Sequence, residues 1–118
     1  MTKPDDAFTV ESHFVDKDSV RRIYDRLLKE ARRFGPVMED PKKTSIHLVN
    51  RTAFAGVATR QHAVTLTIKS DRSLSSPRIH KSEQTSGKRF HHQVRVNSPA
   101  EVDSELVNWL KDAYALSE

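Results

Sequence analysis

Histidine is the side chain of this sequence best suited to chemistry, because a neutral imidazole can bind a metal ion or move a proton near neutral pH. Six histidines occur in the 118 residues. Five of them fall in the central part of the chain: His47, His62, His80, His91 and His92. Cysteine is absent, which excludes disulfides and thiolate metal sites and favours a reducing compartment, so we expect a cytoplasmic protein.

Two of these histidines, His91 and His92, are neighbours in a segment that alternates polar and apolar residues. Adjacent side chains of a strand point to opposite faces, so the two cannot share a metal ion without a bulge or a strand end. His92 keeps the phase of Val94 and Val96, and we prefer to interpret it as a buried, hydrogen-bonded core residue. No carboxylate stands at a spacing that completes a metal site, and we predict no metal and no other cofactor.

His47 and His91 belong to the opposite phase of their strands. That phase is also occupied by Thr65, Thr67, Gln93 and Arg95. If one face of the sheet is uncovered, these side chains converge on it and present polar and cationic groups to an anionic partner. An ordinary polar surface has the same pattern and is the alternative.

Basic residues form a second group with possible chemistry, since cationic surfaces dock phosphates. They lie on the outer face of a predicted helix and in a later loop region: Arg21, Arg22, Lys29, Arg32, Arg33, Arg72, Arg78, Lys81, Lys88 and Arg89. Residues 69–95 hold seven basic and two acidic side chains, against a net charge of +4 for the whole chain. No aromatic residue takes a solvent phase of the predicted strands, so the stacking platforms typical of single-strand binders are missing.

Motifs of known catalytic sites are absent: the sequence has no G-x-S-x-G, H-E-x-x-H or phosphate-binding glycine loop, and only three glycines in total. We therefore do not predict an enzyme. A small hydrolase that uses paired histidines remains an alternative, as does weak nucleic-acid binding through the cationic helix and loop.

Two amphipathic helices are predicted to position these groups. From Val20 to Phe34, apolar residues recur at helical spacing, with Asp16 or Asp18 available as N-cap and Gly35 and Pro36 as the stop. Near the C-terminus, Ser98-Pro99-Ala100-Glu101 reads as a capping box before a second helix that runs to about Ala115.

Between the helices the apolar period falls to two, which predicts half-buried strands. Ile46 and Leu48 mark one strand, residues 64–69 a second with Lys69 on its polar phase, and residues 90–96 a third, with a shorter candidate at Ala53 to Ala58. Residues 70–87 have no such period and are predicted to be a long basic loop that Ile79 pins to the core. We predict an α+β fold: an antiparallel sheet of four to five strands with both helices on one face.

The chain length predicts a single domain over residues 1–118, with residues 1–16 as an N-terminal arm. No apolar run approaches the roughly 20 residues of a membrane span, so no membrane association is expected. A homodimer through the open sheet face is a further alternative.

Several short motifs together resemble a bacterial family of domains of unknown function, family 5655. They are Ser45-Ile46-His47-Leu48, Phe54-Ala55-Gly56-Val57, Pro77-Arg78, Arg89-Phe90-His91-His92, and Glu101-Val102-Asp103 followed by Trp109-Leu110 and Ala113-Tyr114. The likeness covers roughly Phe8 to Leu116. Members occur alone or fused to larger predicted proteins, some of them nuclease-like. The resemblance implies the small α+β fold but no activity, and its recurring polar positions fall here on His47, Arg78, His91 and His92.

From these patterns we expect a non-enzymatic binding module that recognises an anionic partner, with a protein, a small molecule and a nucleic acid as the alternatives. Its predicted binding residues are His47, Arg78, His91, His92 and Arg95.

Overall fold

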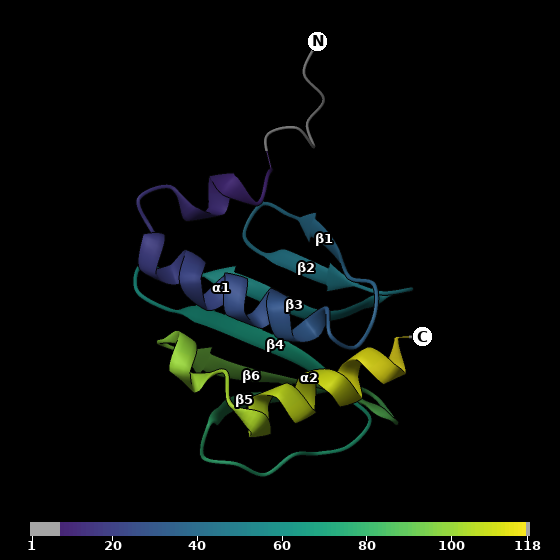
Figure 1. Ribbon diagram of the computed structural model, residues 1–118. Coiled ribbons are helices and arrows are strands. Elements are labelled where there is room, and N and C mark those ends of the chain that lie inside the picture. The colour runs from purple at the N-terminus through teal and green to yellow at the C-terminus, as the bar shows by residue number, and fades with distance from the viewer. Residues whose placement is uncertain (1–7, 118) are drawn as a thin grey trace.

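The computed structural model describes residues 8–117 as an open antiparallel sheet with two α-helices packed against it (Figure 1). The helices are α1 (Asp18–Ala31) and α2 (Ser104–Leu116), with short 3-10 turns at Glu11–Phe14 and Pro99–Glu101. The strands are β1 (Met38–Pro41), β2 (Ile46–Val49), β3 (Ala53–Thr59), β4 (Val64–Ser70), β5 (Ile79–Ser86) and β6 (Arg89–Val96). The α+β fold class is confirmed, but the sheet has six strands rather than four or five.

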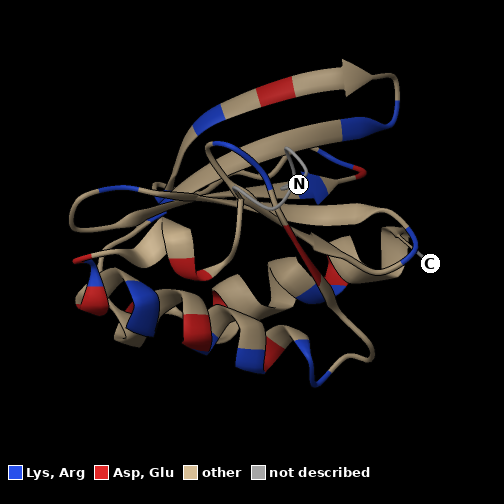
Figure 2. Cartoon of the chain, turned by 90° about the horizontal axis from the view of Figure 1, so that it is seen from above, with Lys and Arg blue, Asp and Glu red and all other residues tan. Residues whose placement is uncertain are grey.

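The sheet order is β1-β2-β3-β4-β6-β5, so β4 lies at the centre and β1 and β5 form the edges. Both helices lie on one side of the sheet and leave the other side bare (Figure 2). Strand burial alternates accordingly: Val64, Leu66 and Ile68 of β4 are buried toward the helices, while Thr65 and Thr67 are only half-buried on the bare side. From here on, the bare side is called the open face.

The apolar stripe of α1 is buried as its spacing predicts, but its capping is different. Lys17 occupies the N-cap position and no side chain caps the helix, so the prediction of Asp16 or Asp18 is wrong. The helix ends at Ala31, and Gly35 is therefore not its left-handed capping residue. Gly35 does have a positive φ of 153°, at a point where a Cβ atom would collide with the hydroxyl of Tyr114.

The second helix begins later than its capping box predicts. Pro99–Glu101 forms a separate 3-10 turn, and Glu101 Oε1 accepts a hydrogen bond of 2.9 Å from the Asn97 backbone instead of from Ser98. Asp103 is the N-cap of α2, and its Oδ1 accepts the Leu106 N–H at 3.1 Å. The predicted apolar stripe is nevertheless the one that packs: Leu106, Leu110 and Ala113 are fully buried.

The edge strands β1 and β5 were not predicted. Strand β5 occupies residues 79–86 of the predicted loop, so that prediction is wrong for this part, and the irregular segment is limited to residues 71–78. Every β5 residue after Ile79 is exposed, and a strand exposed on both sides needs no apolar alternation. Ile79 packs against the hydrophobic core, as predicted.

Part of the predicted N-terminal arm belongs to the folded body. Residues 1–7 lie outside the described residues, but Phe14 is buried with its ring centroid 5.2 Å from that of Tyr24. Across residues 8–117, no helix is both long enough and apolar enough to cross a bilayer.

Candidate functional site

A hollow of about 250 Å³ lies on the open face, over strands β2, β3, β4 and β6. Its polar lining consists of Ser45, His47, Thr67, Lys69 and His91. No Asp or Glu is among the described residues that line it. The hollow therefore offers hydroxyl, imidazole and ammonium groups without a carboxylate to neutralise them, which suits an anionic ligand.

The strand register explains why these side chains meet. His47 lies opposite Gly56, and Gly56 in turn lies opposite Thr67. A Cβ atom on Gly56 would be 3.6 Å from His47 Cδ2, an ordinary contact, so the imidazole ring lies close to the glycine backbone. The absence of a side chain at Gly56 keeps the floor of the hollow low between the two polar residues.

His91 and Lys69 form the other end of the hollow, because they are direct partners across β6 and β4. His47 and His91 stand on strands that are separated by β3 and β4, or three strand spacings, about 14 Å. This separation is too large for two ligands of one metal ion. Within residues 8–117, no three His, Asp or Glu side chains gather as a metal site.

Lys69 has no ion-pair partner in the part of the chain that the structure describes. Its ammonium group is therefore free to meet a ligand, and it is only half-buried. Sequence reasoning placed Lys69 on the polar phase of its strand but did not select it as a site residue. The signal that could have identified Lys69 is the alternation of polar and apolar residues, which also identified His91.

Arg95 shares the open face but not the hollow. It lies opposite Thr65, two residues along β6 from Gln93, and does not line the hollow. Its Nε donates to Asn97 Oδ1 at 3.1 Å, and its side chain is exposed. Arg95 therefore adds positive charge to the open face rather than a contact inside the hollow.

His92 lies on the other side of the sheet and is completely buried. Its Nδ1 is 2.7 Å from Ser82 Oγ and its Nε2 is 3.1 Å from the Arg72 carbonyl oxygen. A carbonyl can only accept, so Nε2 carries a proton and donates it to the Arg72 carbonyl oxygen, while Nδ1 shares a hydrogen bond with the Ser82 hydroxyl. His92 is thus a core residue that cannot reach a ligand on the open face, and it does not form a catalytic pair with His91.

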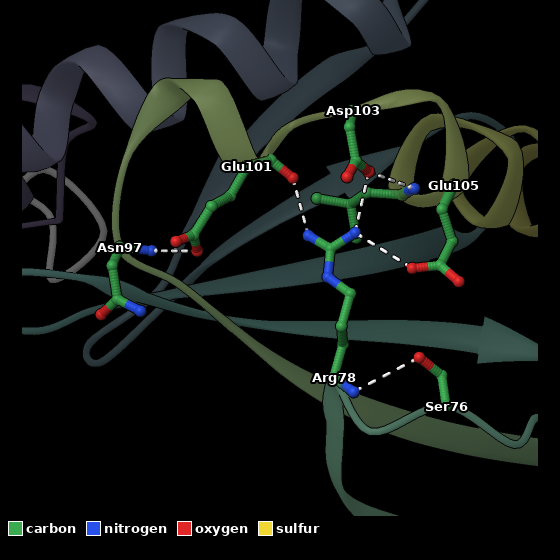
Figure 3. A network of polar contacts seen from close by, with 7 residues as sticks. Ser76, Arg78, Asn97, Glu101, Asp103 and Glu105 are labelled. Atoms are coloured by element: carbon green, nitrogen blue, oxygen red, sulfur yellow. Dashed lines mark hydrogen bonds and ion pairs between the residues drawn. The ribbon is translucent and has the colours of Figure 1, made fainter.

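Arg78 is also separated from the hollow and holds the start of α2 (Figure 3). Its guanidinium donates to Asp103 Oδ1 at 2.8 Å, to Glu105 Oε1 at 3.2 Å and to the Glu101 carbonyl oxygen at 2.7 Å. Burial alone would lower the pKa of Arg78, but the hydrogen bonds to the two carboxylates and their charges outweigh it and raise this pKa. Arg78 therefore joins the segment 71–78 to α2, a structural task.

The cationic surface predicted on α1 is largely compensated by acidic neighbours. Blue and red segments lie side by side along the helices in Figure 2. Among the described residues, ion pairs join Arg21 to Asp25, Arg26 and Arg33 to Glu30, and Arg32 to Glu39. Arg72, in the segment 71–78 that follows β4, pairs with Asp112. These cations are less available to phosphates than the sequence suggests.

Of the five predicted binding residues, the structure thus brings His47 and His91 to one hollow and places Arg95 on the same face. Arg78 and His92 lie elsewhere.

Comparison with known proteins agrees with the motifs quoted above. The family model described as Domain of unknown function (DUF5655) matches residues 10–117. No curated protein and no solved structure matches the chain. Because the match spans nearly the whole chain, including all six strands and both α-helices, the chain belongs to the DUF5655 family.

Proposed function

We propose that this chain is a binding module that takes an anionic group into the open-face hollow. The observation that carries the proposal is the lining itself: His47, Lys69 and His91 surround it, and no described carboxylate does. Phosphate and carboxylate groups are the anions that such donors bind by charge-assisted hydrogen bonds. The anionic group contacts Lys69 and His91 at one end of the hollow, and a ligand longer than that group also reaches His47 at the other end.

The hollow favours a small ligand or a protruding group over a flat macromolecular surface. At about 250 Å³ it is near the lower limit of ordinary small-molecule sites, and it is open to solvent. Inorganic phosphate is therefore a suitable first probe. We expect resonances of β2, β4 and β6 near His47, Lys69 and His91 to shift in a nuclear magnetic resonance titration at low salt, while α1 and α2 stay unchanged.

Lys69→Ala tests the charge that the hollow provides. Loss of one charge-assisted contact weakens phosphate binding by about tenfold. Lys29→Ala is the matched control, because Lys29 is an exposed lysine of α1 with no ion-pair partner among the described residues. Equal losses in the two variants, or no shifts near the hollow, would refute the proposal.

A single-stranded oligonucleotide is the second titrant, since weak nucleic-acid binding is the alternative function. If the cationic helix carried that binding, Lys29→Ala would weaken it and Lys69→Ala would not. For wild type and variants, the slope of the logarithm of the binding constant against the logarithm of the salt concentration gives the number of cationic side chains that contact phosphates.

A further inference from the structure

Strand β5 forms a free edge of the sheet. It is last in the strand order, so the backbone N–H and C=O groups on one of its sides have no neighbouring strand. All its residues after Ile79 are exposed, so no other described segment covers this edge. Figure 2 shows the β5–β6 hairpin standing away from the helix layer, with its outermost strand accessible.

The middle of β5 is regular, although both of its ends are not. Register shifts against β6 occur between Ile79 and Lys81 and again between Gln84 and Ser86. Between them Lys81 lies opposite Gln93, Ser82 opposite His92 and Glu83 opposite His91. Lys81 and Glu83 therefore project on the open face, and Ser82 projects on the helix side, where it contacts His92.

We propose that β5 pairs with β5 of a second copy of this chain, antiparallel and with Ser82 opposite Ser82. A two-fold interface brings the same patch of both copies together, so the patch must complement itself. In this register Lys81 of each copy lies opposite Glu83 of the other, and two ion pairs form on the open face. Opposite charges in directly facing positions stabilise a strand pair, and like charges destabilise it.

The charges also select this register among its neighbours. A shift that places Ser82 opposite Glu83 would move Lys81 opposite Gln84, and both ion pairs would be lost. In the proposed register the two sheets continue into one, and their open faces lie on the same side. Neither Lys81 nor Glu83 has an ion-pair partner within the described residues of its own chain.

Charge reversal tests the pairing, with sedimentation velocity as the readout. Lys81→Glu or Glu83→Lys turns both ion pairs into repulsive pairs, and we expect each variant to weaken the dimer by more than about tenfold. An equal mixture of the two variants restores complementary charges and should form the dimer again. The double variant, Lys81→Glu with Glu83→Lys, should also dimerise like the wild type.

Lys88→Glu is the matched control, because Lys88 is an exposed lysine that follows β5 in the hairpin turn. It makes the same change in net charge as Lys81→Glu and should leave the dimer unchanged. Circular dichroism verifies that every variant is folded. The proposal is overturned if the wild type stays monomeric at about 1 mM, if either single reversal dimerises like the wild type, or if the mixture does not recover the dimer.

Discussion

His91 and His92 are neighbours in the sequence, and their imidazole rings lie on opposite faces of the sheet. The ring of His92 is completely buried with both nitrogens hydrogen-bonded, whereas His91 lines the hollow beside Lys69. Strand geometry alone separates them, since successive side chains of β6 alternate between the faces. Two residues of the same type thus serve the core and the surface.

Replacing the two histidines in turn should therefore affect different properties. We expect His92→Ala to lower the free energy of unfolding by about 2 to 4 kcal/mol, because it leaves a cavity and removes one of the two donors to the Arg72 carbonyl, the Ser70 hydroxyl being the other. His91→Ala should change it by less than about 0.5 kcal/mol and weaken phosphate binding. Urea denaturation and phosphate titration measure both effects. Equal destabilisation by the two variants would contradict the opposite placement of the rings.

Gly35→Ala should destabilise the fold through a contact that is distant in sequence. The added methyl group meets the Tyr114 hydroxyl, which donates to the Pro36 carbonyl oxygen at 2.9 Å. We expect a loss of about 1 to 3 kcal/mol from strain and crowding. Tyr114→Phe removes the crowded oxygen, so Gly35→Ala should cost less in that background. Additive losses in thermal unfolding of the single and double variants would exclude the contact as the cause.

Asp103→Ala should remove the N-cap of α2 and the partner of Arg78 at once, at a cost of about 1 kcal/mol. The hydrogen bond from Arg78, then that from the Leu106 N–H, holds the pKa of Asp103 below its ordinary value of 3.8. A lowered pKa means that the carboxylate stabilises the folded state above pH 3.8 and ceases to do so as the pH falls further. The stability difference between wild type and variant should accordingly shrink below that pH.

Arg78→Met separates the two causes of the lowered pKa of Asp103, because it removes the guanidinium of Arg78 and leaves the hydrogen bond from the Leu106 N–H. We expect the pKa of Asp103 to rise toward 3.8 in this variant, as followed by carboxyl resonances. An unchanged pKa would show that the helix cap alone lowers it.

Tyr24→Phe tests the partly buried hydrogen bond between α1 and β1. The Tyr24 hydroxyl donates to Glu39 Oε2 at 2.6 Å, and its loss should cost about 1 to 3 kcal/mol at neutral pH. Burial, reinforced by the bond to Glu39, raises the pKa of Tyr24 above its ordinary 10.0. The neutral phenol therefore stabilises the fold below pH 10.0, and this contribution declines as the pH rises beyond it. Denaturation at several alkaline pH values should show the wild type approaching the variant.

The elements that the sequence predicts are those with an apolar side to bury. The stripes of α1 and α2 and the alternation in β2, β4 and β6 arise from contact with one core, so their periods are visible in the chain. Strand β5 buries little and contains only one apolar residue, Ile79, so backbone pairing with β6 decides its conformation. Backbone pairing of this kind requires no particular residue types, so the sequence of β5 contains no pattern that predicts a strand.

The candidate site was predictable to the extent that it follows strand phase. His47 and His91 share the polar phase of their strands, and the structure brings them to one hollow. The position of Arg78 depends on how residues 71–78 fold back toward α2, and no local pattern encodes this contact across 25 residues. No local sequence pattern encodes the close approach of Gly35 to Tyr114 either.

The exposure of β5 determines which part of the sheet unfolds locally. Since only Ile79 of this strand packs against the core, β5 can detach from β6 with little loss of apolar contact, while the central strand β4 opens only with the whole domain. In the monomer, amide protons of β5 should thus exchange with solvent much faster than those of β4. Local unfolding at this edge also breaks the contact between Ser82 and His92. Because Glu83 of β5 lies opposite His91 of β6, the part of the sheet that opens first is the one beside His91.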